Sequence, residues 1–296
     1  MSYYPDPTGA GDPITGLNNF TKSFTISNPA YSYDIKIDQI FSEKSRLSGR
    51  YSRYYGESGG AKFFDNPADP NPNGGLGSNS LHNFVLEHNW TLNPSAIWTN
   101  RFGVERQYAP RRTPEFDPTA AGFPPVLKDV NGRGTFPRID VESYSSLGQF
   151  GWTDTTSART QFIVASSLSK VIGPHNLKFG GEQITSFVNF WQPGYPSGNF
   201  SFGRTTTMEQ IFNPDPSQGN GLASLLLDFG DANAWNGINI QPGTANKSKQ
   251  TGFFIQDDWR VTQRLTLNVG LRYEWSTPFT EPVSYTHLTL PTIYSV

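Results

Sequence analysis

The residues Leu265-Thr266-Leu267-Asn268-Val269-Gly270-Leu271-Arg272-Tyr273-Glu274-Trp275 decide the fold, because every second side chain in this stretch is apolar. The residues between them are polar or small. Strict period-two alternation places one set of side chains on each face of a β-strand. Strands of soluble sheets are usually only about five or six residues long. A longer strand with aromatic residues at its far end fits a wall between lipid and water, so the stretch predicts a transmembrane β-strand.

The composition narrows the class of protein. The 296-residue chain has 29 Gly, 23 Pro and no Cys, and only 16% of its residues are charged. A formal net charge of −2 gives no argument for a nucleic-acid partner. The lack of Cys excludes disulfide frameworks, thiol catalysis and Cys-ligated zinc. No apolar run approaches the roughly eighteen residues that a membrane helix needs, so the composition favours an all-β protein with long loops.

Strand-like segments occur in pairs along the chain. The four pairs are residues 31–41 with 46–55, 81–91 with 96–108, 159–172 with 176–190, and 250–261 with 265–275. Short turns join the members of each pair, whereas segments rich in Gly, Pro and Asn separate the pairs, at residues 56–80, 109–158 and 191–249. This alternation is typical of an antiparallel transmembrane β-barrel with short periplasmic turns and long extracellular loops. Within the third long loop, residues 221–230 predict a short packing helix.

Side-chain chemistry gives each strand a predicted orientation. Aromatic residues near the short turns should form one interfacial girdle (Phe41, Trp90, Trp98, Trp259), and those near the long loops a second (Tyr54, Tyr55, Tyr108, Phe190, Tyr273, Trp275). A lysine facing lipid at mid-bilayer costs roughly 2–4 kcal/mol, so Asp34 and Lys36 should face the lumen. Asp257 shares its predicted face with Phe253 and Ile255. It lies either near the periplasmic interface, where the cost falls to about 0–1 kcal/mol, or on a bulge that turns it inward.

These segments resemble the barrel of Oar-like TonB-dependent receptors. The similar blocks are residues 33–42, 46–52, 175–182 and 253–273, in the order and with the spacing of that family. The resemblance covers residues 31–282 and implies a partial barrel, about eight strands of a 22-stranded type. In the family the barrel is plugged by an N-terminal domain and energised through TonB. Because no plug or TonB box is recognisable in this sequence, no ligand-binding or TonB-contacting residue is carried over from the family.

Both ends of the chain are expected to lie outside the barrel. Residues 1–30 show no signal-peptide pattern and are expected to be an extracellular loop or an incomplete N-terminus. Residues 283–292 resemble the translation of a sequencing adapter, so residues 283–296 are expected to be read-through and the chain a fragment. The alternative for this tail is a loop that opens a ninth strand.

The candidate site residues form two sets and predict ligand binding. Lumen-facing charges would line a substrate path (Asp34, Lys36, Arg272, Glu274), and loop aromatics would bind sugars or peptides (Trp191, Tyr195, Phe200, Trp235). Packing of the loops on themselves is the alternative for the second set. We find no catalytic, metal or cofactor constellation and expect no enzyme. The leading interpretation is an outer-membrane TonB-dependent receptor for an unknown extracellular substrate, with membrane lipid and the TonB complex as partners. The alternative is a secreted, soluble β-sandwich that binds glycans.

Overall fold

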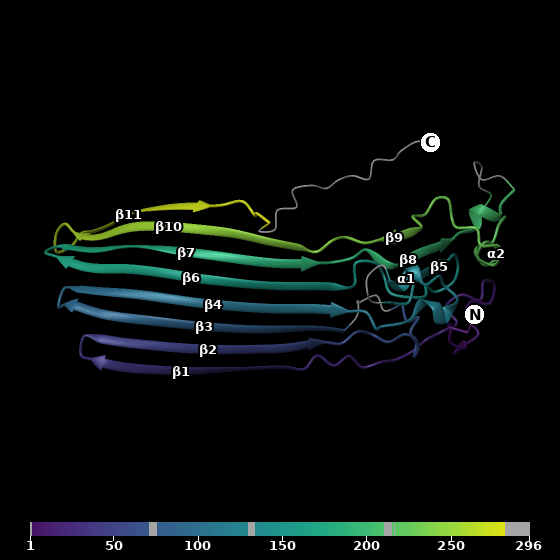
Figure 1. The fold of residues 1–296 in the computed structure, drawn as a ribbon, viewed down its shortest axis with the longest axis horizontal. Helices are drawn as coiled ribbons and strands as arrows, with labels where there is room; N and C mark the ends of the chain where they lie inside the picture. The colour runs from purple at the N-terminus through teal and green to yellow at the C-terminus, as the bar shows by residue number, and fades with distance from the viewer. Residues whose placement is uncertain (1, 71–75, 130–133, 210–214, 216, 282–296) are drawn as a thin grey trace.

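The protein is dominated by one antiparallel sheet of eight long strands (Figure 1). A computed structural model describes residues 2–70, 76–129, 134–209, 215 and 217–281. The strands of the large sheet are β1 (Ala30–Ser42), β2 (Ser45–Ser58), β3 (Leu76–Asn93), β4 (Ala96–Arg112), β6 (Thr155–Ile172), β7 (His175–Trp191), β10 (Thr244–Arg260) and β11 (Thr266–Ser276). They pair in this order from β1 to β11. Among the described residues, no helix is both long and apolar enough to cross a bilayer.

All eight predicted strands are confirmed, and most of them continue farther toward the long loops than expected. β10, for example, begins at Thr244 instead of residue 250, and β3 begins at Leu76 instead of residue 81. The added residues of β10, such as Asn246 and Ser248, are mostly polar. Because these added residues are polar on both faces of the strand, they give no alternating pattern in the sequence. Their backbone nevertheless pairs with β7 as regularly as the rest of β10 does. The alternation therefore marked only the part of each strand that has one apolar face.

The register gives the sheet two chemically different faces, because directly paired residues on neighbouring strands share a face. On the first, which we call the outer face, one row runs across five strands through Ile35, Tyr51, Phe84, Val104 and Phe162. A second row on this face joins β7, β10 and β11 (Phe179, Ile255, Leu271). Leu271 is 72% exposed and Val269 is 62% exposed. An apolar surface of this extent, left uncovered, fits contact with lipid.

The opposite, inner face is polar and carries ion pairs. Asp38, Glu87, Arg101 and Glu182 lie in one row across the sheet. Its carboxylates lie close to cations of the same face, with N–O distances from 2.5 to 3.2 Å (Lys36–Asp38, Arg46–Asp38, Arg101–Glu87, Arg159–Glu105, Arg272–Glu182). The prediction that Asp34 and Lys36 point away from the apolar face is confirmed, because both alternate with Ile35 and Ile37.

The register places most of the predicted girdle aromatics on the outer face, but not all of them. Trp90 and Trp98 stack on the outer face near the short turns, with ring centroids 6.1 Å apart. At the loop end, the register also places Tyr55, Tyr108, Tyr273 and Trp275 on the outer face. The prediction is wrong for Tyr54 and Phe190, which lie on the inner face. Tyr54 is adjacent to the outward Tyr55, and neighbouring strand residues point to opposite faces.

The position of Asp257 is resolved by the register of β10. Pairing on both sides of β10 continues without a shift from residue 250 to residue 259, so no bulge turns Asp257 inward. The residue stays on the outer face, close to the end of β10 at Arg260. Its Oδ2 lies 2.6 Å from Nδ1 of His175, and the His175 ring stacks on Trp259 with centroids 5.3 Å apart. The structure thus agrees with the interfacial alternative.

The large sheet is open within the described residues, as predicted for a partial barrel. β1 pairs only with β2, and β11 pairs only with β10, so both outer edges of the sheet lack a neighbouring strand there. No second large sheet packs on either face, so the sandwich interpretation is wrong for this part of the chain. The prediction for residues 283–296 falls outside the described residues.

The long loops contain more regular structure than predicted. β5 (Arg138–Val141), β8 (Tyr195–Phe202) and β9 (Gly237–Asn239) form a small second sheet in the order β5-β8-β9. Short helices accompany it: η1 (Pro118–Ala121), α1 (Val126–Asp129), η2 (Arg204–Thr207) and α2 (Gly221–Leu226). The predicted helix at residues 221–230 is confirmed in its first part. It ends earlier, where Asp228 adopts a positive φ of 55°.

Candidate ligand-binding cap

The small sheet and the segments around it form a cap on one end of the large sheet (Figure 1). We use the term cap for residues 2–29, 59–70, 113–154 and 192–243, as far as they are described. The hydrophobic core lies here and not in the large sheet: Phe64, Ala68, Phe136 and Leu147 are buried together. Aromatic residues from the N-terminal segment pack against this cluster (Tyr3, Tyr4, Phe20). Burial of these rings from water stabilises the cap as a folded unit.

Backbone and side-chain hydrogen bonds tie the distant cap segments together. The side-chain nitrogen of Asn66 donates to the Tyr3 carbonyl at 2.8 Å, and the Gly148 N–H donates to the Ala68 carbonyl at 2.8 Å. The Glu142 N–H donates to the Phe202 carbonyl at 2.9 Å. The four segments therefore hold one another in place, which is the rigidity that a binding surface built from loops requires.

An open hollow of about 770 Å³ lies on the cap between the N-terminal segment and the second and third long loops. Its wall combines aromatic rings, amides and one ion pair (Tyr4, Asn19, Phe20, Phe64, Glu142, Tyr144, Arg204, Asn220). This size lies within the range of about 300–1,000 Å³ that is typical of small-molecule sites. A mixed aromatic and polar lining suits a ligand with both apolar faces and hydrogen-bonding groups.

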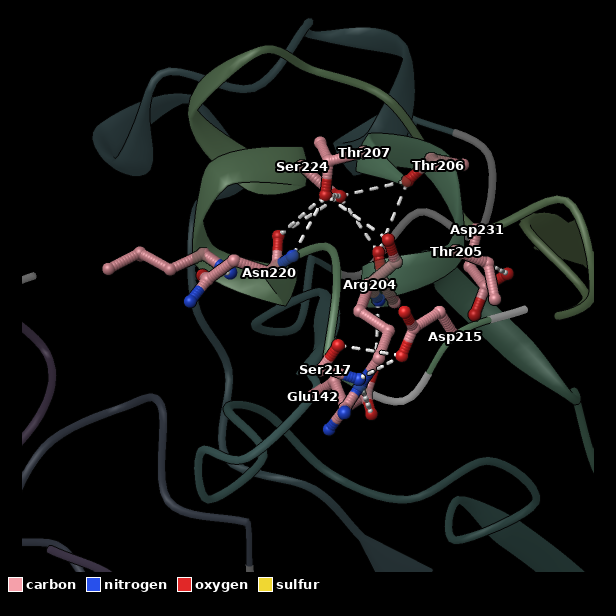
Figure 2. Close-up of polar contacts among 12 residues, drawn as sticks. Glu142, Arg204, Thr205, Thr206, Thr207, Asp215, Ser217, Asn220, Ser224 and Asp231 are labelled. Atoms are coloured by element: carbon pink, nitrogen blue, oxygen red, sulfur yellow. Dashed lines mark hydrogen bonds and ion pairs between the residues drawn. The ribbon is translucent and has the colours of Figure 1, made fainter. Parts of the chain in front are cut away.

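One wall of the hollow is fixed by a hydrogen-bond network between η2 and α2 (Figure 2). The Ser224 hydroxyl, which is fully buried, donates to the Gly203 carbonyl at 2.8 Å and accepts from the Thr206 hydroxyl at 2.8 Å. Asn220 caps α2, because its Oδ1 accepts from the N–H groups of Leu222 and Ala223 at 2.8 and 3.2 Å. These bonds satisfy amides that a helix end leaves free and hold Asn220 at the rim.

Glu142 and Arg204 form the charged part of the wall (Figure 2). The Arg204 Nε lies 2.5 Å from Glu142 Oε1, and the Arg204 backbone N–H donates to Oε2 at 2.7 Å. Both side chains are partly exposed, at 33% for Arg204 and 38% for Glu142. The pair bridges the segment after β5 to the segment after β8, so it orients two charged groups at the rim of the hollow.

Tyr4 lines both this hollow and a second one of about 740 Å³. Burial raises the pKa of the Tyr4 phenol to about 12, with further contributions from nearby Tyr144 and Asp140. Its ring packs edge-on against Phe64, with centroids 6.4 Å apart. Within the described residues its hydroxyl has no hydrogen-bond partner. The Tyr4 phenol thus stays neutral across the ordinary pH range, with its hydroxyl withdrawn from solvent.

The four loop aromatics predicted from sequence are only partly brought together. Tyr195 and Trp235 contact each other with ring centroids 5.3 Å apart, while Phe200 packs on Phe123 at 5.4 Å. Trp191 lies at the end of β7, with the Arg112 guanidinium 5.6 Å from its ring centroid. None of the four lines the 770 Å³ hollow. Their role as ligand contacts stays a prediction, and their observed contacts are those of loop packing.

The predicted lumen residues share the inner face but do not converge. Asp34 and Lys36 lie on β1, whereas Arg272 and Glu274 lie on β11, at the opposite edge of the sheet. Arg272 contacts both Glu182 and Glu274 at 2.5 Å, and Asp34 accepts a hydrogen bond from Ser52. Seven strand spacings of about 4.8 Å separate the two pairs along the sheet. They can line one path but cannot form one compact site.

Sequence reasoning missed the residues that line the hollow. Tyr4, Glu142, Arg204 and Asn220 come from three segments that are far apart in the chain. The only local signal was Asn220 directly before the predicted helix, which is a preferred N-cap residue. Among the residues that the structure describes, no cluster of His, Asp or Glu is arranged to hold a metal ion.

The chain is similar to several solved outer-membrane proteins. Among solved structures, the outer membrane transporter YddB from Escherichia coli matches with a TM-score of 0.52 and 10% identity, over 84% of this chain and 27% of that chain. The ferric-catecholate import receptor Fiu from E. coli K12, open form, gives 0.48 and 11% over 85% and 37%. The siderophore receptor PiuA from Acinetobacter baumannii gives 0.43 and 12% over 88% and 36%. The chain therefore spans well under half the length of these proteins.

No curated protein sequence matches the chain. The family model of the outer membrane beta barrel domain, in contrast, matches residues 1–289. This match accounts for the lipid-compatible outer face, the polar inner face and the alternation of short turns and long loops, and it places the protein in the outer membrane. The chain belongs to the outer membrane beta barrel domain family.

Proposed function

We propose that the chain is part of a TonB-dependent receptor of the Oar-like type that binds an extracellular ligand at the cap and takes it up. The observation that carries this proposal is the rigid, hollowed cap on the end of a sheet with a charged inner face. The four sequence blocks that resemble Oar-like receptors support the subtype. The likeness to YddB, which is described as an outer membrane transporter, supports the fold in which such uptake occurs.

In this proposal residues 31–282 are the receptor barrel with its loops, and residues 1–30 belong to the extracellular side. The hollow lined by Tyr4, Tyr144 and Arg204 is the first contact for the ligand. Ion-paired groups of the inner face, including Lys36 and Arg272, line the path that follows. Most of those cations are already paired with carboxylates. They can therefore hydrogen-bond a polar solute, but the path does not strongly favour solutes of one charge sign. Residues 283–296 have no part in the proposal.

Uptake is tested with three strains in one defined medium that contains candidate nutrients. Mass spectrometry follows the depletion of each compound by wild-type cells, by cells lacking the gene and by cells lacking TonB. We expect at least one compound to be depleted only by the wild type. Equal depletion by the strain without TonB contradicts energised uptake, and equal depletion by all three strains contradicts a transport role.

The cap hollow is tested with the compound identified in that way. Arg204→Ala together with Tyr144→Ala should weaken its binding to detergent-solubilised protein by about tenfold or more, since both residues line the hollow. A matched control is Arg264→Ala with Tyr273→Ala, which lie in the fourth short turn and on the outer face. Unchanged binding by the cap variant would move the ligand site away from the hollow.

A further inference from the structure

The outer face carries a group of cations at the end of the sheet that bears the cap. Arg53, His82 and Arg106 are consecutive partners across β2, β3 and β4, and Lys247 continues the same row on β10. Lys249 lies two residues farther along β10 on the same face. We call Arg53, Arg106, Lys247 and Lys249 the outer cation belt. Nothing in the proposed uptake path uses these residues, because they point away from the inner face.

The belt lies at and just above the height where the apolar band ends. Arg53 is eight residues beyond the start of β2 and Arg106 is ten beyond the start of β4, whereas Lys249 is eleven and Lys247 thirteen before the end of β10. At about 3.3 Å per residue and a strand tilt of about 40°, these positions are roughly 20–33 Å above the short turns. The apolar band of such barrels is about 25 Å tall. Aromatic residues of the loop-side girdle, Tyr55 and Tyr108, occupy neighbouring outer positions of the same strands.

Belt cations differ from those of the inner face in their partners. Five inner-face cations pair with carboxylates (Lys36, Arg46, Arg101, Arg159, Arg272). Within the described ranges, none of the four belt cations forms an ion pair with a carboxylate. Arg53 donates to the Ser80 hydroxyl at 2.8 Å and contacts His82, while Arg106 donates to Thr160 at 2.6 Å. The Lys247 Nζ lies 5.4 Å from the Phe187 ring centroid.

Two acids near the belt are bonded to other groups. Glu281 lies beside the belt residue Lys247, because Thr280 bridges to Lys247. The Glu281 Oε1 accepts from the Ala245 N–H at 3.2 Å. Glu57 lies on the outer face of β2, farther toward the cap than Arg53, and its carboxylate accepts a hydrogen bond from the Tyr55 hydroxyl at 2.8 Å. Tyr55 in turn lies under the Arg53 guanidinium, 5.9 Å from ring centroid to Cζ. The ring thus fixes the guanidinium at the interface, and its positive charge is left for a partner outside the chain.

We propose that the outer cation belt binds phosphate groups of the membrane lipid in the leaflet on the cap side. Cations at the boundary of a lipid-facing surface, without carboxylates to neutralise them, are complementary to lipid phosphates. Arginine suits this ligand because its planar guanidinium binds phosphate oxygens in a bidentate manner. The proposal rests on the location of the protein in the outer membrane. That the leaflet is the outer one rests, in addition, on the orientation given under the proposed function. The phosphorylated lipid then anchors the barrel at a fixed depth.

The test measures binding of diphosphorylated lipid A and of its dephosphorylated counterpart to the detergent-solubilised full-length protein by native mass spectrometry. Wild-type protein should prefer the phosphorylated lipid. Replacing Arg53, Arg106, Lys247 and Lys249 by Gln should weaken its binding by roughly fivefold per charge removed. The matched control removes four other cations in the same way (Lys44, Lys170, Lys178, Arg264), which lie in short turns, at the turn end of the outer face or on the inner face. It should bind as the wild type does.

Two results overturn the proposal. One is equal binding of both lipids by the wild-type protein, which needs no variant and so does not depend on the folding of a mutant. The other is an equal loss of binding in the matched control. A charge-preserving variant (Arg53→Lys, Arg106→Lys, Lys247→Arg, Lys249→Arg) should retain the preference for phosphate, and its failure to do so would also count against the belt.

The orientation of the protein in the membrane is tested separately by cysteine labelling. Single Cys substitutions are specific for this purpose, because the chain contains no Cys. Asn233→Cys in the cap should react with a membrane-impermeant maleimide on intact cells, and Glu43→Cys in the first short turn should not. Labelling only at Glu43→Cys contradicts the proposed orientation and the outer leaflet, whereas preference for the phosphorylated lipid in detergent reports on the belt alone.

Discussion

At the scale of single residues, the outer face tolerates an acid only where it has a partner. Asp257 lies on the outer face and contacts His175 at 2.6 Å, with the two side chains 25% and 37% exposed. Its Oδ1 is buried and, among the described residues, has no hydrogen-bond partner. An acid of this kind depends on its one contact, since an unpaired polar group away from water costs free energy.

Replacing only one member of this pair should therefore be worse than replacing both. His175→Leu should lower the free energy of unfolding by about 1 kcal/mol, because it leaves Asp257 without its partner on a lipid-facing surface. The double variant His175→Leu, Asp257→Leu should recover most of that loss. Urea unfolding in detergent, followed by gel migration of unheated samples, measures both variants. A double variant as unstable as the single one would show that the pair itself, not the unpaired acid, matters.

Tyr4 gives the cap a measurable response to alkaline pH. Burial raises the pKa of its phenol in the folded protein to about 12, from an unfolded value of about 10. A raised pKa means that its stabilising contribution is complete below about pH 10 and is lost as the pH rises toward 12. Ultraviolet titration of Tyr4→Phe should show one late-ionising tyrosine fewer than titration of the wild type. A late component of unchanged amplitude in Tyr4→Phe would show that Tyr4 does not contribute to it.

At the scale of elements, the long strands could be predicted from sequence and the short ones could not. β11 alternates over its whole length, so its face and its ends were both readable. β5 has four residues and β9 has three, which is too short for a period to show. Each exists because β8 pairs with it, and the pairing joins residues more than thirty positions apart, such as Ile139 and Phe200. The hollow escaped prediction for the same reason, since its walls meet only through such contacts.

The stability of helix α2 depends on its N-cap residue, Asn220, more than on the length of the helix. It has six residues, too few to be stable alone, and Asn220 accepts two of its first N–H groups. Asn220→Ala should destabilise the cap by about 1 kcal/mol, whereas Asn220→Asp should be nearly neutral, because Asp also caps well. Hydrogen exchange at Leu222 and Ala223 measures the local effect. Equal exchange in the two variants would contradict a capping role.

At the scale of the whole molecule, the backbone groups along the two outer edges of the large sheet need hydrogen-bond partners. Lipid offers no hydrogen bonds, so the free edges of β1 and β11 need other strands beside them in the membrane. We expect that these two edges do not meet each other. The sheet order supports this, because β1 and β11 are the two outermost strands and do not pair with each other within the described residues.

Cysteine pairs test this arrangement on a background free of natural Cys. Ile37→Cys with Leu271→Cys should not form an intramolecular disulfide in the membrane, because the bond needs Cα atoms within about 7 Å. Ile35→Cys with Tyr51→Cys, which are direct partners on β1 and β2, should do so. An intramolecular disulfide between β1 and β11 would show that the eight strands close on themselves.

The location of the hydrophobic core has a consequence for temperature. Phe64, Phe136 and Leu147 are withdrawn from water, and all three lie in the cap. Unfolding the cap exposes apolar surface to water and therefore has a positive heat-capacity change. Apolar side chains on the outer face of the strands contact lipid or detergent, and both are apolar environments, so they contribute little to that change. Calorimetry in detergent should therefore assign the curvature of the stability profile to the cap. Cooling would loosen the cap while the large sheet stayed intact.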